Sequence, residues 1–141
     1  MTDIKTVPLP EELVSLAQET IPAILGTTRS DGTAQMNPIW YEYDGESFWL
    51  NAADSRAWLE HLRRDPRVTL LLIDPTNMWR WAQIQGRVTE IDDDAQRGAD
   101  HINRLSQRYL GHVYGGFREG ETRVTLRVEP VRVTGSFAWG G

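Results

Sequence analysis

Three arginines occur in one short segment, SRAWLEHLRRDP, at residues 55–66. Arg63 and Arg64 fall in the last turn of the helix that this segment predicts, where cations complement the helix dipole, so capping and solvation can account for them. Arg56 falls in the first turn, where the dipole disfavours a cation. Two partners could balance its charge: the Glu60 carboxylate four residues later, or a phosphate bound at the free N–H groups of the helix start. The residues alone leave both open.

A second unusual pattern is WRWAQIQG, at residues 79–86. If this segment is a strand, its side chains alternate, and Trp79, Trp81, Gln83 and Gln85 share one face. Such a face is too polar for a plain core and too aromatic for a plain solvent face. It predicts a subunit interface, hence a homodimer, or a surface for a flat aromatic ligand between subunits, and the two are compatible.

Other catalytic chemistries have no signature in this sequence. His61, His101 and His112 share no ligand spacing with one another or with a carboxylate pair, so we interpret them as surface or loop residues and predict no metal. The chain has no cysteine, which excludes disulfides, thiolate metal sites and cysteine nucleophiles. It also has no GxSxG, Walker or GxGxxG motif, so neither a serine hydrolase nor a common phosphate-binding loop is supported.

Length and composition favour one ordinary globular domain over residues 1–141, large enough to bury a core. The chain carries 20 acidic and 15 basic residues, a formal net charge of -5, and no basic block, which disfavours a nucleic-acid partner. Its apolar runs have the length of strands, and its first residues lack an apolar leader segment. We therefore expect a cytoplasmic protein that has no membrane partner.

Turn residues and hydrophobic periodicity divide the chain into short elements. Helices are predicted at 8–20, 55–64 and 92–111. The predicted strands are a three-strand meander over 21–52, a central strand over 67–74, a long strand over 79–92 with a bulge or close approach at Gly86, and two strands over 122–139 hinged at Glu129 and Pro130. The glycine-rich loop 111–121 is predicted to be the most mobile internal segment, as a lid or as a plain connector.

About seven strands with two or three helices among them, and no strand–helix–strand alternation, predict a mainly β protein. The architecture expected from this pattern is an antiparallel β-barrel with peripheral helices. A doubly wound parallel sheet is excluded.

The order of these features resembles the split β-barrel flavin-binding superfamily of pyridoxamine 5'-phosphate oxidase. Within it, the chain is most similar to the actinobacterial branch of small dimeric proteins that use the deazaflavin coenzyme F420 or FMN. The likeness is carried by AILGTTRSDGTAQMNPIWYEYDGESFWLN, SRAWLEHLRRDPRVTLLLIDPTNMWRWAQIQGRV, LSQRYLGHVYG and RVTLRVEPVRVTG. The most specific marker is LRRDPRV after a short helix.

This resemblance implies a split β-barrel of the FMN-binding type, with a ring cofactor in a groove at the dimer interface and no catalytic side chain. It implies that the short helix and the strand end before it bind the cofactor phosphate. Matched residue by residue, it assigns cofactor binding to Arg56 at the phosphate, Asn51 and Ala52 at the strand end, Gln35, Asn37 and Ile39 beside the ring, and Trp79 and Trp81 reaching the cofactor from the partner subunit.

The chain departs from the branch pattern beside the phosphate. Trp58 stands where the branch usually has a phosphate-binding lysine, and by this position it is the ninth residue predicted to bind the cofactor. Glu60 and His61 stand where the branch often has RN. A lost charge-assisted hydrogen bond costs about 1.5 to 3 kcal/mol, so phosphate binding should weaken unless other groups compensate.

Two functions therefore stay open. One is a flavin- or deazaflavin-dependent oxidoreductase that transfers hydride to or from a small organic substrate. The other is a non-redox binding protein whose groove, re-lined by Trp58, Trp79 and Trp81, holds another flat or apolar ligand. Trp58→Lys separates them, since it should strengthen cofactor binding in the first case and destabilise the fold in the second.

Overall fold

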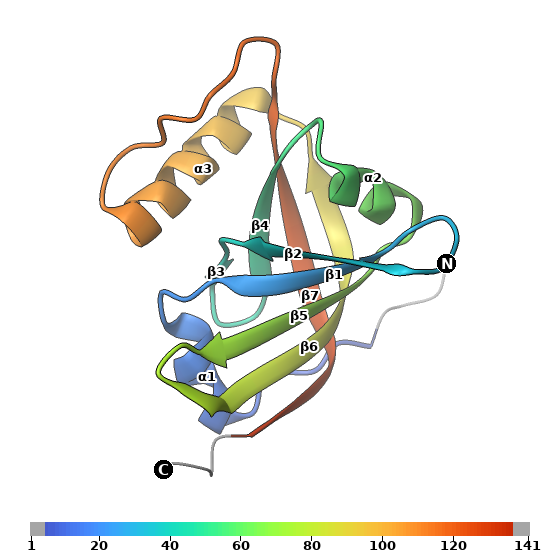
Figure 1. Cartoon of the computed structure of the whole chain (residues 1–141), viewed down its shortest axis with the longest axis vertical. Coiled ribbons are helices and arrows are strands. Elements are labelled where there is room, and N and C mark those ends of the chain that lie inside the picture. Colours follow the sequence, from blue (N-terminus) through green and yellow to red (C-terminus); the bar gives the residue numbers. More distant parts are fainter. Residues whose placement is uncertain (1–4, 137–141) are drawn as a thin grey trace.

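The computed structural model describes residues 5–136, which form a seven-stranded antiparallel sheet curved into a half-barrel, with three helices (Figure 1). The strands are β1 (Ala23–Thr28), β2 (Ala34–Ile39), β3 (Glu42–Tyr43), β4 (Phe48–Ala53), β5 (Arg67–Asp74), β6 (Asn77–Asp92) and β7 (Arg123–Ser136). The helices are α1 (Glu11–Gln18), α2 (Ala57–Arg64) and α3 (Ala95–Leu110). The predicted mainly β, split-barrel architecture is confirmed. No helix within this part of the chain is long and apolar enough to span a membrane.

The sheet order is β2-β1-β5-β6-β7-β4-β3, and every neighbouring pair is antiparallel. β5 lies between β1 and β6, which confirms its predicted place inside the sheet. Its alternating residues Val68, Leu70 and Leu72 point into the core together with Ala82 and Ile84 of β6. α1 adds Leu13 and Leu16 to the same core, so the apolar stripe of the first helix is used as expected.

The predicted three-strand meander over 21–52 is wrong. β1 and β2 form a hairpin, and β3 and β4 form a second one, but β2 and β3 lie at opposite ends of the sheet order. β4 instead pairs along its whole length with β7. Pro38 suits β2 to an edge position, because proline lacks the N–H that a strand paired on both sides would use. Tyr41 lies in the chain between the two hairpins and is fully buried. Its hydroxyl donates a hydrogen bond to the Ala17 carbonyl, which holds the segment between β2 and β3 in place.

The two strands predicted over 122–139 are one continuous strand, β7, as far as Ser136; residues 137–139 lie outside the described part. Opposite Pro130 the register with β6 shifts between Gln85 and Gly86, and this irregularity absorbs the proline without ending the strand. A Cβ atom on Gly86 would lie 2.7 Å from Val128 Cγ1 and 2.9 Å from the Glu129 carbonyl oxygen. The predicted close approach at Gly86 is confirmed.

Candidate functional site

Two adjoining cavities of about 540 and 460 Å³ form one groove, and they share Asn37, Arg56, Trp58, Tyr114 and Arg123. We call this the β2–α3 groove, because its walls come from β2, the end of β4, the start of α2, α3 and the loop that follows α3. Its size suits a small organic ligand or cofactor. Seven of the nine predicted cofactor-binding residues line it: Gln35, Asn37, Ile39, Asn51, Ala52, Arg56 and Trp58.

One end of the groove is polar and the other is apolar. The polar end is lined by Ser55, Arg118 and Glu121 in addition to Arg56 and Arg123. The further residues of the apolar end are Pro22, Pro38, Ile39, Trp40, Ala52, Ile102 and Leu105. The groove therefore offers cationic donors at one end and flat hydrophobic surface at the other.

Arg56 stands immediately before α2, with φ -70° and ψ 131°, and not in the first helical turn as predicted. Its side chain makes no hydrogen bond or ion pair within residues 5–136. Glu60 instead lies 3.8 Å from Arg63, so the candidate carboxylate partner is engaged elsewhere. The guanidinium of Arg56 is therefore available to an anion in the groove.

Arg63 and Arg64 do not line the groove. Arg63 donates to Asp93 at 2.6 Å, and Arg64 donates to the backbone carbonyl of Thr28. These contacts attach the end of α2 to β1 and to the segment before α3. Their role is structural.

The second cation of the groove, Arg123, was missed in the sequence, where an arginine at the start of a closing strand carries no distinctive signal. Its side chain is only 9% exposed, and its guanidinium lies over the Tyr114 ring, 5.3 Å from the ring centre. Its Nη1 is 3.8 Å from a Glu121 carboxylate oxygen. Burial lowers the pKa of Arg123, and the positive charge of Arg56 contributes in the same direction. The two arginines therefore place positive charge in the same region of the groove.

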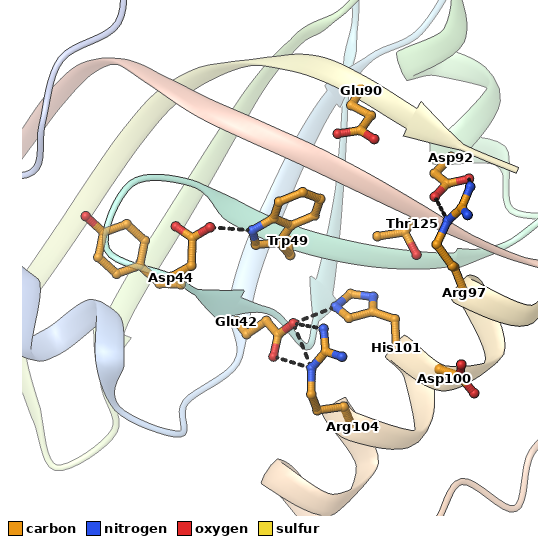
Figure 2. Close-up of a pocket in the computed structure, with 11 residues that line it drawn as sticks. Glu42, Asp44, Trp49, Glu90, Asp92, Arg97, Asp100, His101, Arg104 and Thr125 are labelled. Carbon is orange, nitrogen blue, oxygen red and sulfur yellow. Dashed lines mark hydrogen bonds and ion pairs between the residues drawn. The ribbon is translucent and has the colours of Figure 1, made fainter. Parts of the chain in front are cut away.

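A separate cavity lies on the other side of α3 and is acidic. Glu42, Asp44, Glu90, Asp92 and Asp100 line it (Figure 2). Most of these charges are already paired. Asp44 accepts a hydrogen bond from Trp49 Nε1 at 2.8 Å, Asp92 binds Arg97, and Glu42 binds Arg104. This cavity therefore does not resemble the cationic end of the groove.

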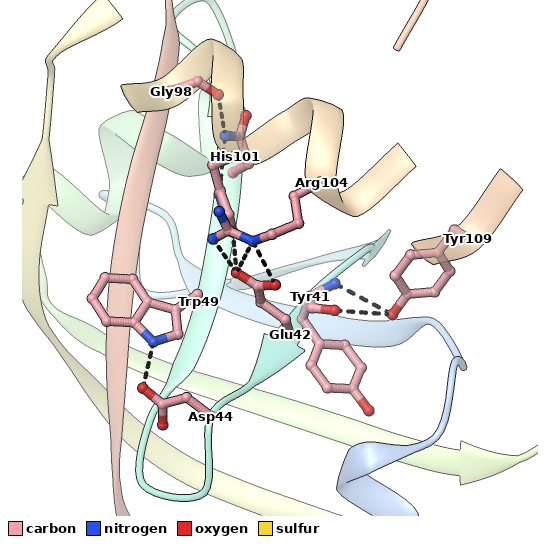
Figure 3. Close-up of polar contacts among 9 residues, drawn as sticks. Tyr41, Glu42, Asp44, Trp49, Gly98, His101, Arg104 and Tyr109 are labelled. Atoms are coloured by element: carbon pink, nitrogen blue, oxygen red, sulfur yellow. Dashed lines mark hydrogen bonds and ion pairs between the residues drawn. The ribbon is translucent and has the colours of Figure 1, made fainter. Parts of the chain in front are cut away.

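A buried polar cluster separates the acidic cavity from the groove (Figure 3). Asn51 donates from Nδ2 to the Gly98 carbonyl at 3.0 Å and accepts at Oδ1 from Arg123 Nε at 2.8 Å. His101 Nδ1 lies 3.1 Å from the same Nδ2, and His101 Nε2 lies 3.1 Å from Glu42 Oε1. The interpretation of His101 as a surface or loop residue is wrong, because it is 3% exposed. Both polar atoms of the Asn51 side chain thus have partners within the protein, and no ligand is needed to satisfy them.

A family model described as pyridoxamine 5'-phosphate oxidase matches residues 9–137. The chain belongs to the pyridoxamine 5'-phosphate oxidase family. A solved structure named F420 Reductase is 30% identical, with a TM-score of 0.80, and the match covers 89% of this chain and 98% of that chain. The resemblance inferred from the sequence is thereby confirmed. At the level of the family, it supports a flavin-related oxidoreductase.

Two other solved structures share the fold at lower identity. A conserved hypothetical protein from Mycobacterium tuberculosis is 22% identical, with a TM-score of 0.70 over 99% of this chain and 98% of that chain. General Stress Protein 26 from Bacillus anthracis is 15% identical, with a TM-score of 0.65 over 87% of this chain and 89% of that chain. These likenesses concern the fold alone.

Of the three residues that depart from the pattern of the family's actinobacterial branch, only Trp58 lines the groove. Glu60 is exposed and His61 bonds to Thr27 Oγ1 at 3.0 Å, and neither lines the groove. Trp58 does line it, yet its side chain also packs into the main hydrophobic core and is 5% exposed. The polar end of the groove thus gains no carboxylate from Glu60, and the arginines Arg118 and Arg123 join Arg56 there.

Trp79 and Trp81 do not line the groove of their own chain. Both are on β6, whose opposite face carries Ala82 and Ile84 into the core. Trp79 is 56% exposed near the β5–β6 hairpin, which also carries the exposed residues Ile73 and Met78. The assignment of both tryptophans to a groove in the partner subunit stays a prediction.

The Glu42 carboxylate makes the fold sensitive to acid. Burial alone would raise its pKa, but the contacts from His101 and Arg104 outweigh burial and lower the pKa to about 2. Because the folded-state pKa lies below the ordinary value, this stabilisation is present above about pH 4.5 and is lost as the pH falls toward 2. Between about pH 6 and pH 3, urea unfolding should show the wild type losing about 1.5 kcal/mol more stability than Glu42→Gln. Equal losses would contradict this role of Glu42.

Proposed function

We propose that the β2–α3 groove binds FMN or the deazaflavin coenzyme F420, and that the protein is an oxidoreductase that transfers hydride between this cofactor and a small organic substrate. The observation that carries the proposal is that Arg56 and Arg123 both line a groove that is polar at one end and largely apolar at the other. Membership of the family and the 30% identity to a protein named F420 Reductase support the same conclusion.

The donors present in the groove fit an anionic cofactor with a flat ring. Arg56, Arg118 and Arg123 face a single lining carboxylate, Glu121, so the polar end has an excess of positive charge for phosphate groups. The N-terminus of α2 lies beside Arg56 and favours an anion through its dipole. The lysine missing at Trp58 is thus compensated by guanidinium groups from other elements.

The apolar end would receive the ring. Ile39, Trp40 and Leu105 offer flat or aliphatic surface that excludes water from the reacting face. Gln35 donates to Asn37 Oδ1 at 2.9 Å, which orients the Asn37 amide at the groove wall. When bound, the ring supplies the hydride chemistry, and the protein supplies binding, orientation and a dry environment.

The arginine pair predicts a phosphate-dependent loss of affinity. Arg56→Gln and Arg123→Gln should each weaken FMN and F420 binding by about tenfold to a hundredfold, because each removes a charge-assisted contact to a phosphate. Riboflavin, which lacks the phosphate, should bind the wild type and both variants alike. Quenching of tryptophan fluorescence on titration measures all three ligands.

Arg132→Gln is the matched control, because Arg132 is exposed on the same strand as Arg123 and does not line the groove. Its affinities should equal those of the wild type. If the wild type binds neither FMN nor F420, the proposed cofactor site is wrong, and a non-redox protein that binds another flat ligand becomes the better description.

We also propose that the protein is a homodimer whose interface includes the β5–β6 hairpin. Ile73, Met78 and Trp79 are 38%, 66% and 56% exposed there, and burial of this apolar surface against a second copy would be favourable. Light scattering at micromolar concentration should return twice the mass of one chain, and Met78→Ser with Trp79→Ser should shift it toward the monomer. A monomeric wild type would refute the dimer.

A further inference from the structure

We infer that His101 and Glu42 are positioning residues that hold the guanidinium of Arg123 in the β2–α3 groove, acting through Asn51. The four residues come from α3, β3, β7 and β4, and together they form a continuous polar chain from the acidic cavity to the groove. Figure 3 shows the part of this chain at Glu42 and His101. The inference rests on the proposed function only for the identity of the ligand that Arg123 meets.

The orientation of the Asn51 amide is fixed by two partners that cannot exchange roles. The Gly98 carbonyl can only accept a hydrogen bond, so Asn51 Nδ2 faces it at 3.0 Å. Arg123 Nε–H can only donate, so Asn51 Oδ1 faces it at 2.8 Å. A flipped amide would place two donors together and two acceptors together.

This amide orientation determines the protonation of the histidine ring. Asn51 Nδ2 also lies 3.1 Å from His101 Nδ1, so Nδ1 must accept, and the proton of the neutral ring belongs on Nε2. That nitrogen lies 3.1 Å from Glu42 Oε1, although off the N–H direction of a well-aligned hydrogen bond. The carboxylate favours this tautomer, and Arg104 in turn binds Glu42.

Arg123 depends on this arrangement because its side chain is largely buried. Its Nε is held by Asn51, while its guanidinium lies over Tyr114 and lines both parts of the groove. If the amide were free to turn, Nε would lose its acceptor in a buried place, and the guanidinium would no longer have one preferred position. His101 is a third contact that opposes this turn, because its unprotonated Nδ1 would then face Asn51 Oδ1, one acceptor against another.

The test is a double-mutant cycle on FMN affinity. His101→Leu removes both polar contacts of the ring and should weaken FMN binding by about tenfold in the wild-type background, but by less than about twofold in an Arg123→Gln background. His101→Gln keeps one acceptor and one donor, and should retain most of the affinity. His61→Leu, a half-buried histidine away from the groove, is the matched control and should bind as the wild type does.

Equal losses in both backgrounds would overturn the inference, because a general packing defect does not depend on Arg123. If His101→Leu fails to fold, ¹⁵N NMR of the unmodified protein decides the question: a proton on Nε2 and none on Nδ1 supports the inference, and the opposite tautomer overturns it. This measurement needs no ligand. A wild type that binds no FMN would therefore refute the proposed function while leaving the histidine arrangement testable.

Discussion

Gly98→Ala should destabilise the fold by about 3 kcal/mol or more, although alanine is normally the better helix former. A Cβ at this position would lie 1.9 Å from the Arg123 carbonyl oxygen and 2.5 Å from its carbon. Both are backbone atoms, so α3 would have to move away from β7. Helix propensity alone makes this glycine a weakness in the helix, but in the structure it permits the contact between helix and strand.

The displacement should also reach the groove, since Gly98 supplies the carbonyl that orients Asn51. Urea unfolding measures the loss of stability, and FMN titration measures the loss of affinity. Gly115→Ala is the matched control, because a Cβ there meets nothing within 4 Å. Equal stability of the two variants would contradict the proposed contact between α3 and β7.

Trp58→Lys should destabilise the fold by about 3 to 5 kcal/mol, even though lysine is the residue that the branch usually has at this position. Trp58 is 5% exposed and packs in the main core, so the substitution removes a large buried aromatic and brings an ammonium group toward apolar surroundings. This cost exceeds the gain from one added charge near a phosphate. Thermal or urea unfolding, followed by FMN titration of the folded protein, measures both.

Trp58→Phe is the control, since it keeps most of the apolar volume and should cost much less than the lysine. A Trp58→Lys protein as stable as the wild type, with tighter FMN binding, would show that the side chain reaches the polar end of the groove. In that case Trp58 would contact the ligand without contributing to the stability of the core. The structure favours the opposite result. Because Trp58 packs in the core whichever ligand the groove binds, its substitution by lysine does not separate the two functions in the way expected from the sequence.

The candidate site was only partly predictable. The family resemblance assigned Asn37, Ile39 and Arg56 to one cofactor site, and all three line the groove. Arg123 was missed because nothing local distinguishes it from other strand arginines. It meets Asn51 across 72 residues, and a contact at that separation leaves no periodic trace in the chain.

The sequence by itself determined the features that depend on neighbouring residues. The turn at Gly32, the amphipathic helices and the apolar run of β5 follow from backbone sterics and hydrophobic period. Only the tertiary structure decided that β4 pairs with β7, that 123–136 is one strand, and that His101 is buried. These outcomes depend on which distant surfaces bury the most apolar area and pair the most polar groups, a competition among all elements that no single segment records.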